Sequence, residues 1–203
     1  ARSSVMGALT EDYATNVQVV ERALRVGQSF DMLTKRLVLS DGELTLFFID
    51  GFAKDTVLQK LMMHFLSLKS LSKSAGECME CCLPYIETDV TDNFESMIHM
   101  VMSGGTLILG TSFGREGILL DTRTYPARET AEPEGDRVMR GSRDGFVETL
   151  VFNTALIRRR IRDTALTMQY LTVGRRSKTD VVLCYLKGQA DGDYVKKLQK
   201  KLL

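Results

Sequence analysis

Apolar residues in the first half of the chain recur at two different spacings, which predict helices alternating with strands. Residues 10–26 repeat apolar positions at helical spacing, and Gly27 follows as the residue expected to end this helix. Two apolar runs, 37–39 and 44–49, flank Asp41-Gly42, and this dipeptide between two strands is typical of a hairpin turn. A helix followed by a β-hairpin is therefore expected.

The same reasoning extends the alternation toward the middle of the chain. Helical spacing predicts helices over 54–68 and 93–102. A short strand is expected at 83–87. Residues 106–109 and 117–121 predict a second strand pair, because the glycine-bearing run between them favours a hairpin turn.

The second half of the chain begins with charged residues of both signs. Residues 128–142 contain Pro133 among these charges and are expected to form a linker. A long helix is then expected over 143–171, followed by a strand at 179–186 and a helix at 193–203.

Together these elements predict an α/β protein with two mixed α/β lobes joined by a charged linker. The N-terminal lobe is assigned to residues 1–127, the linker to 128–142 and the second lobe to 143–203. Because both element types occur on either side of the linker, each lobe is expected to have its own sheet.

The helix expected over 143–171 carries an apolar stripe that includes an arginine. At about 100° per residue, Arg158 falls within a stripe of eight mostly apolar residues that should pack on the second-lobe sheet. These eight residues are Val147, Leu150, Val151, Thr154, Ile157, Ile161, Ala165 and Met168. An unpaired buried charge is too costly to persist, so the Arg158 guanidinium should reach a carboxylate or backbone carbonyl groups.

The opposite side of this helix combines an apolar pair with arginines. Phe152 and Leu156 lie there, and the surrounding arginines are Arg159, Arg160 and Arg162. Interface centres favour aromatic residues and arginine, so this side is interpreted as an exposed interaction patch. The alternative is that these arginines pair with carboxylates of the same chain. The candidate carboxylates are Glu132, Glu134, Asp136 and Glu148.

Arginine is the basic residue used throughout the middle of the chain. Between Lys73 and Lys178, every basic residue is an arginine. Its planar fork of donors suits fixed carboxylate or phosphate contacts, whereas lysine provides a mobile point charge. We therefore expect specific docking by the arginine helix, and a solvated face where lysines gather at 196–201.

Composition limits the possible functions. The chain has 203 residues, is 44% hydrophobic and carries a net charge of +1, which allows one sizeable core or two modest ones and disfavours nucleic acid as a partner. Its four cysteines, without a secretory signal, indicate reduced thiols in a cytoplasmic-type compartment. Neither an apolar run of about 18 residues nor a signal sequence occurs, so we expect no membrane span within this sequence.

Motifs for metal binding or catalysis are incomplete. Cys78, Cys81 and Cys82 have a C-x-x-C spacing, but a zinc site needs about four ligands. Only two histidines, His64 and His99, could add imidazole. Incidental thiols are the favoured interpretation, with a metal or redox site as the alternative. No carboxylate pair is singled out as an acid/base couple, so we expect no enzyme activity, no cofactor and no metal.

Several motifs follow one another in a fixed order. The central ones are EPE at 132–134, RG at 140–141, RDGFVE at 143–148, Asn153 and RRRIR at 158–162, and they are preceded by GQSFDM at 27–32 and LFFIDGFAKD at 46–55. In this order they resemble the A subunit of GerA-type spore germinant receptors, over nearly the whole chain. Within that family, the sequence of residues 143–163 and 174–180 is similar above all to that of one sporulation paralogue.

The resemblance implies a non-enzymatic domain of a membrane protein that takes part in nutrient-triggered ion release. In the family, several transmembrane helices follow this domain, which continues somewhat beyond Leu203, so the second lobe is expected to be incomplete here. The expected location is the spore inner membrane, with the domain on the cytoplasmic, spore-core side. The expected partners are further copies of the full-length protein, as a homo-oligomer, and other germination membrane-protein subunits.

We expect these subunit contacts to be made by residues of the linker and the arginine helix. The residues assigned to interaction are Arg128, Glu132, Glu134, Arg140, Arg143, Asp144, Glu148, Phe152, Asn153, Leu156, Arg158, Arg159, Arg160 and Arg162. The alternative function is a small-molecule sensor in which a cleft between the lobes binds an amino acid, nucleoside or sugar.

Overall fold

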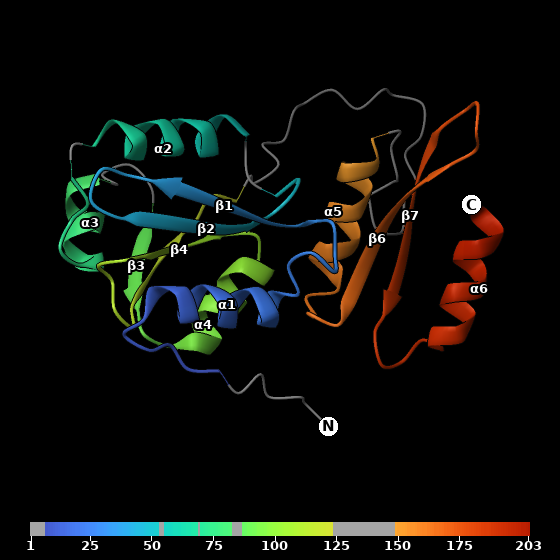
Figure 1. Cartoon of the computed structure of the whole chain (residues 1–203), viewed down its shortest axis with the longest axis horizontal. Coiled ribbons are helices and arrows are strands. Elements are labelled where there is room, and N and C mark those ends of the chain that lie inside the picture. Colours follow the sequence, from blue (N-terminus) through green and yellow to red (C-terminus); the bar gives the residue numbers. More distant parts are fainter. Residues whose placement is uncertain (1–6, 53–54, 69, 83–86, 124–148) are drawn as a thin grey trace, which may run out of the picture.

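A computed structural model describes residues 7–52, 55–68, 70–82, 87–123 and 149–203 of the chain. Its elements, in order, are α1 (Tyr13–Leu24), β1 (Met32–Val38), β2 (Glu43–Ile49), α2 (Asp55–Ser67), α3 (Ala75–Cys82), β3 (Thr88–Thr91), α4 (Phe94–Met102), β4 (Thr106–Gly110), β5 (Gly117–Leu120), α5 (Leu150–Arg160), β6 (Leu166–Val173), β7 (Thr179–Leu186) and α6 (Gly192–Leu202). We call the part from α1 to β5 the first lobe and the part from α5 to α6 the second lobe (Figure 1). The linker predicted at 128–142 lies outside the described residues.

The strands of the first lobe form one antiparallel sheet. Its strand order is β1-β2-β4-β5-β3, so the hairpins β1–β2 and β4–β5 meet through β2 and β4. Strand β3 pairs with β5 at one edge, and β1 forms the other edge. Both strand pairs predicted from the sequence are confirmed.

Helices cover both faces of this sheet (Figure 1). Helices α1 and α4 pack on the face to which Phe47 and Leu107 point. Helices α2 and α3 pack on the opposite face, which receives Leu46 and Ile108. Because successive strand residues point to opposite faces, β2 and β4 each supply both cores, and the first lobe has three layers.

The ends of α1 show how local sequence positions a helix. The Asp12 carboxylate accepts a hydrogen bond from the Thr15 amide at 2.8 Å and so caps the first turn. The helix ends at Arg25, whose φ of 58° lies in the left-handed region. Gly27, the predicted terminating residue, also has a positive φ but lies beyond the cap. The helix therefore ends earlier than predicted.

The other predicted elements of the first lobe have mixed outcomes. The helices expected over 54–68 and 93–102 are confirmed as α2 and α4. Helix α3, which contains Cys78, was not predicted. Most of the short strand expected at 83–87 lies outside the described residues, and the strand that is described there, β3, begins at Thr88.

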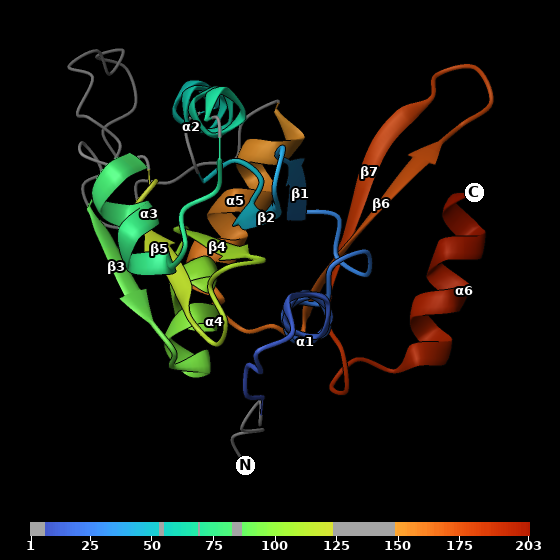
Figure 2. The same cartoon turned by 60° about the vertical axis from the view of Figure 1, so that its left-hand side comes forward.

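The second lobe has a separate two-stranded sheet. Strands β6 and β7 pair antiparallel from Leu166 opposite Leu186 to Val173 opposite Thr179, which confirms the predicted strand at 179–186. The predicted C-terminal helix is confirmed as α6, and none of its residues is buried. Figure 2 shows α6 beside the hairpin, on the side away from the first lobe.

The single long helix predicted over 143–171 is wrong. Helix α5 ends at Arg160, and β6 begins at Leu166. The chain turns at Asp163, whose carboxylate accepts a hydrogen bond from the Ala165 amide at 2.8 Å. Aspartate side chains stabilise such turns in competition with the helix, and the β-branched residues that follow favour a strand. Three residues of the predicted stripe, Ile161, Ala165 and Met168, therefore lie beyond the helix.

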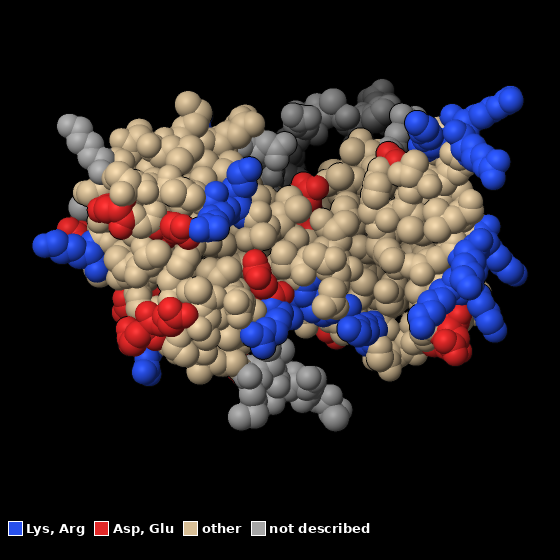
Figure 3. Space-filling model, in the orientation of Figure 1, with Lys and Arg blue, Asp and Glu red and all other residues tan. Residues whose placement is uncertain are grey.

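Charged side chains are unevenly distributed along the long axis of the molecule. Figure 3 shows lysine and arginine gathered over the β6–β7 turn and α6, at the right, and acidic side chains over the end of the first lobe, at the left. Among the described residues, no helix combines the length and the hydrophobicity that are needed to cross a bilayer.

Candidate functional site

The most distinctive side chain at the junction of the lobes is Arg158 on α5. Its exposed fraction is 0%, and it is the largest fully buried side chain among the described residues. Arginine is rarely buried without partners, because a guanidinium loses its hydration on burial. The contacts of Arg158 therefore define the candidate site.

The Arg158 guanidinium donates to a carboxylate, a hydroxyl and two backbone carbonyl groups. Its Nε lies 2.8 Å from Asp31 Oδ2, and its Nη2 lies 3.0 Å from Asp31 Oδ1, so the pair is bidentate. Nη2 also lies 3.1 Å from Ser29 Oγ and 3.0 Å from the Leu166 carbonyl oxygen, while Nη1 lies 3.1 Å from that of Asp163. The prediction that Arg158 reaches a carboxylate or carbonyl groups is confirmed.

The acidic partner comes from the first lobe. Asp31 precedes β1 and is 1% exposed, and the hydroxyl of Ser29 donates to its Oδ1 at 2.6 Å. The Asp31 carbonyl oxygen accepts a hydrogen bond from the Asp50 amide at 2.9 Å, which fixes the loop to the end of β2. The carboxylate is thus held in position by the five-stranded sheet.

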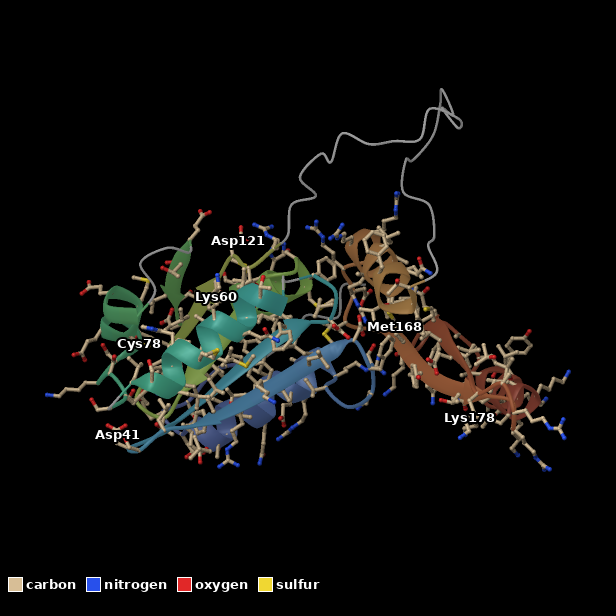
Figure 4. All side chains as sticks on the ribbon, turned by 90° about the horizontal axis from the view of Figure 1, so that it is seen from above. Asp41, Lys60, Cys78, Asp121, Met168 and Lys178 are labelled. Carbon is tan, nitrogen blue, oxygen red and sulfur yellow. The ribbon has the colours of Figure 1, made fainter. Side chains whose placement is uncertain are left out.

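Backbone hydrogen bonds join the same loop to β6. The Phe30 amide donates to the Met168 carbonyl oxygen at 2.9 Å, and the Met168 amide donates to Ser29 Oγ at 2.9 Å. Figure 4 shows Met168 where the second lobe meets the first, while Lys178 lies at the far end of the second lobe. One loop of the first lobe therefore binds both α5 and β6.

Arg25 forms a second polar bridge between the lobes. Its Nη1 lies 3.0 Å from the Ala165 carbonyl oxygen, 3.3 Å from that of Thr164 and 2.7 Å from Thr167 Oγ1. Because these acceptors lie just before β6 and at its start, the end of α1 is fixed to the beginning of the second-lobe sheet. Arg25 is also the residue at the end of α1 whose backbone lies in the left-handed region.

Helix α5 also packs closely on the first lobe. Ala155 belongs to the core beneath α1 and α4. A Cβ added at Gly51 would lie 3.1 Å from Val151 Cγ1 and 3.2 Å from the Ala155 Cβ, and Gly51 has a φ of +81°. Close approach and backbone conformation both require glycine there. The predicted stripe was expected to pack on the second-lobe sheet, but its Val151 lies against the first lobe.

The predicted interaction patch is only partly at the surface. Phe152 is 45% exposed, and Arg160 and Arg162 are exposed as well. Leu156 is only 7% exposed, so its predicted place in an exposed patch is wrong. Helix α5 lies between the lobes: it contacts β7, and the Arg159 guanidinium lies 5.2 Å from the ring centroid of Phe52 in the first lobe.

Other residues assigned to interaction have different outcomes. Asn153 lies on α5 and is half-buried, and its backbone amide donates to the Thr149 carbonyl oxygen at 3.2 Å. The remaining assigned residues lie outside the described residues; they are Arg128, Glu132, Glu134, Arg140, Arg143, Asp144 and Glu148. The carboxylates proposed as alternative partners of the arginines lie there too.

Sequence reasoning missed three residues of the junction, Arg25, Ser29 and Asp31. Two of them lie in the motif GQSFDM, which supported the family resemblance but was given no structural role. A signal was available, because a buried arginine requires a carboxylate and Asp31 is an acidic residue inside that motif. The separation of 127 residues between Asp31 and Arg158 hides the pairing from any local pattern.

The cysteines offer limited chemistry within the described part of the chain. Cys78 is buried in α3, and Cys184 lies on β7. Desolvation raises the pKa of the Cys184 thiol, and the negative charge of Asp31 raises it further. The residues that the structure describes contain no cluster of three or more potential metal ligands.

An open groove lies on the first lobe, along α4. Its lining includes Asn93, Ser96, His99, Ser103 and Arg123. The buried hydroxyl of Ser103 has no hydrogen-bond partner among the residues that the structure describes. Arg123 pairs with Asp121 and lowers the pKa of that carboxyl group, mainly through the hydrogen bond between them. All the lining residues belong to the first lobe, so this groove differs from the predicted cleft between the lobes.

Comparisons with known sequences place these features in a wider context. A model of the Bacillus/Clostridium GerA spore germination protein family matches residues 18–203. The chain is 31% identical over 194 residues to stage V sporulation protein AF of Bacillus subtilis, covering 93% of this chain and 39% of that protein. It is 27% identical over 203 residues to spore germination protein B1 of the same organism, covering 96% of this chain and 40% of that protein.

Two further matches concern a membrane protein and a solved structure. The chain is 28% identical over 160 residues to the uncharacterized membrane protein YfkQ of Bacillus subtilis, covering 76% of this chain and 30% of that protein. The N-terminal domain of the A subunit of the Bacillus megaterium spore germinant receptor GerK3 has a similar fold, with a TM-score of 0.73 and 20% identity over 97% of this chain and 72% of that chain. The chain thus spans 30% to 40% of the length of these three curated relatives.

Proposed function

Because the chain belongs to the GerA family of spore germination proteins, we propose that it is a non-catalytic interaction domain of a larger germination membrane protein. In this role it contacts sister copies and other subunits, and it couples their arrangement to ion release by the membrane part. The proposed site of action is the spore inner membrane, with the domain on the cytoplasmic, spore-core side. Relatives that are by name a spore germination protein and a membrane protein support germination and a membrane location.

The buried junction around Arg158 is the observation that carries this proposal. Its guanidinium, 0% exposed, joins α5 to Asp31 of the first lobe and to the start of β6. Separating these groups would leave a buried charge unpaired, which is costly. A displacement of the second lobe is therefore transmitted to the first lobe, as coupling between subunits and a membrane part requires.

A non-catalytic role fits the chemistry of Cys184. The thiolate is the nucleophilic form of cysteine, and the raised pKa of Cys184 keeps its thiol protonated near neutral pH. The neighbouring Asp31 carboxylate is already engaged by Arg158 and Ser29. We assign these groups to structure and not to catalysis.

We assign the subunit contact to exposed side chains along α5 and in the residues that follow it. This α5 surface consists of Phe152, Arg160, Ile161 and Arg162, of which Phe152 is 45% and Ile161 38% exposed. Exposed apolar side chains surrounded by arginine suit the centre of a protein interface. Leu156, which is 7% exposed, is not part of this surface.

The test is Phe152→Asp in the full-length protein. A charge within an assembled interface is costly to desolvate, whereas it remains solvated in the free domain. We expect the variant domain to melt near the wild-type temperature, the full-length protein to have a lower oligomer mass, and spores carrying it to release ions more slowly. Met63→Asp is the matched control, because Met63 is an apolar helix residue that is 71% exposed on α2. Wild-type assembly of the Phe152→Asp protein would contradict the assigned surface.

A second candidate function is sensing of a small molecule at the groove along α4. The buried, unpartnered hydroxyl of Ser103 favours it, because such a group gains a hydrogen bond when a polar ligand enters. A ligand at a hundredfold excess over its dissociation constant stabilises a protein by about 2.7 kcal/mol. Amino acids, nucleosides and sugars should therefore be screened by thermal melting. We expect no shift, and a shift that Ser103→Ala abolishes would rank sensing above assembly.

A further inference from the structure

The end of the second lobe away from the first lobe carries a concentrated positive charge. We call this surface the basic end; it consists of Arg175, Arg176, Lys178, Lys196, Lys197, Lys200 and Lys201, all of them exposed. The first three lie at the β6–β7 turn and the other four on α6. Figure 3 shows this positive surface over both elements at the right of the molecule.

The charge of the chain is strongly asymmetric, although its total is near zero. Residues 166–203 contain eight lysines or arginines and three aspartates, a net charge of +5, whereas residues 1–165 contain 19 basic and 23 acidic residues, a net charge of −4. The exposed acidic residues at the opposite end of the first lobe are Glu77, Glu80, Glu87, Asp89 and Asp92. The molecule is thus an electric dipole along its long axis (Figure 3).

The acidic residues of α6 lie at its start, away from the lysines of its last turn. Asp191 caps the start of α6, and Asp193 lies in its first turn, whereas Lys200 and Lys201 lie in the last turn. Asp180 accepts a hydrogen bond from the Tyr170 hydroxyl. The lysines of the last turn are therefore free of an opposing carboxylate on their own turn of the helix.

The type of basic residue indicates the kind of partner. Lysine is depleted at the centres of protein interfaces, where arginine is preferred, and it acts as a mobile, hydrated point charge. Val195, Leu198 and Leu202 on α6 are half-buried, and Gln199 is hydrogen-bonded to Gln169 of β6. The apolar side of α6 is therefore turned toward the hairpin, and its lysines suit a diffuse negative surface better than a shaped protein pocket.

We propose that the basic end docks on the anionic headgroups of a phospholipid bilayer. One relative of this chain is by name a membrane protein, which supports a bilayer as the negative surface. Each lysine or arginine near an anionic bilayer strengthens binding about fivefold, within a screening length of about 8 Å at physiological salt. The acidic end is repelled by the same surface, so the domain would stand end-on, with the first lobe away from the bilayer.

Vesicle sedimentation with the 203-residue chain tests this proposal. We expect binding to vesicles that contain phosphatidylglycerol, no binding to pure phosphatidylcholine vesicles, and a steep loss of binding as salt rises. A variant with Lys196, Lys197, Lys200 and Lys201 all changed to glutamate should bind at least about tenfold more weakly. These side chains are exposed, so its melting temperature should stay close to that of the wild type.

The matched control changes the same number of charges elsewhere. It replaces Arg22, Lys35, Lys60 and Lys73, exposed basic residues of the first lobe, with glutamate. This control has the same net charge as the α6 variant, and we expect it to retain vesicle binding. An equal loss of vesicle binding in both variants would show that only the net charge of the chain matters, and it would overturn the proposal.

The wild-type chain and the α6 variant also distinguish a bilayer from two other kinds of partner. Lysine-dependent binding to a DNA duplex that is tighter than binding to anionic vesicles would assign the basic end to nucleic acid. Salt-sensitive self-association that the α6 variant loses, without vesicle binding, would assign it to the acidic end of a second copy. Either result would overturn lipid docking. The test needs no subunit assembly, so its outcome is independent of the function proposed above.

Discussion

The five-stranded sheet of the first lobe is covered by helices on both faces, whereas the two-stranded sheet of the second lobe is buried only where it meets the first. In the described part of the second lobe beyond α5, the buried residues are Leu166, Thr167 and Met168, at the start of β6. Strand β7 and helix α6 bury no residue. A two-stranded sheet is marginally stable by itself, so the second lobe depends on the junction for its stability.

This difference suggests a division of work between the lobes. The first lobe provides a rigid core, and the junction around Arg158 fixes the start of the second lobe to it. The remainder of the second lobe has no buried residue and carries the basic end. If this comparison is correct, substitutions at the junction should cost much more stability than substitutions farther along the second lobe.

Arg158→Ala should have the largest effect. Removing one partner of a buried ion pair leaves the other charge unpaired, and we expect unfolding to become easier by about 3–5 kcal/mol. Arg160→Ala is the control, because Arg160 is exposed on the same helix and surface changes usually stay within about 0.5 kcal/mol. Thermal melting of both variants measures the difference. Equal melting temperatures would show that the ion pair at the junction does not stabilise the protein.

A double-variant cycle sharpens this prediction. Arg158→Met leaves the Asp31 carboxylate buried without its charged partner. Asp31→Leu leaves the Arg158 guanidinium buried without its carboxylate. The double variant removes both charges, so it should be less destabilised than the sum of the two single variants. Additive losses would mean that Arg158 and Asp31 contribute independently.

Met168→Ala should have the next largest effect. Met168 is fully buried where β6 meets the first lobe, and truncation of a buried methionine costs about 2–5 kcal/mol. We expect the lower part of this range, because the junction can partly close around the cavity. Leu198→Ala on α6 is the comparison, since Leu198 is half-buried and should cost about 1 kcal/mol. A loss at Leu198 as large as that at Met168 would show that the second lobe has a core of its own.

Local pattern predicted the elements of both lobes better than it predicted their junction. The Asp41-Gly42 turn and the strand at 179–186 depend on neighbouring residues, and both are confirmed. The helix over 143–171 was wrong because an apolar stripe at helical spacing continued past the turn at Asp163. The spacing of Ala165 and Met168 suits a helix, but the β-branched residues from Thr167 onward favour a strand.

The candidate site could be predicted only in part, because its partners are distant in sequence. Burial of Arg158, and its need for an acceptor, followed from the apolar stripe. Its pairing with Asp31 did not, since the two residues belong to different lobes. Leu156 was predicted to be exposed but is buried, because the first lobe covers α5 in addition to the second-lobe sheet.

The smallest effect is expected at Arg25, where a backbone cost and a contact between the lobes oppose each other. A non-glycine residue in the left-handed region costs about 1–2 kcal/mol, and Arg25 has a φ of 58°. Its guanidinium donates hydrogen bonds to the Ala165 carbonyl oxygen and to Thr167 Oγ1. Hydrogen bonds from a charged group contribute about 1.5–3 kcal/mol. The contact therefore offsets the strained backbone that ends α1.

Two substitutions at Arg25 separate these contributions. Arg25→Ala loses the contact and keeps the backbone cost, whereas Arg25→Gly loses the contact and relieves the backbone. We expect the alanine variant to be less stable than the glycine variant by about 1 kcal/mol, with glycine near the wild type. Urea unfolding of both proteins, with Arg22→Ala as an exposed control on the same helix, measures the difference. Equal losses for alanine and glycine would show that the backbone is unstrained, and an unchanged alanine variant would show that Arg25 does not join the lobes.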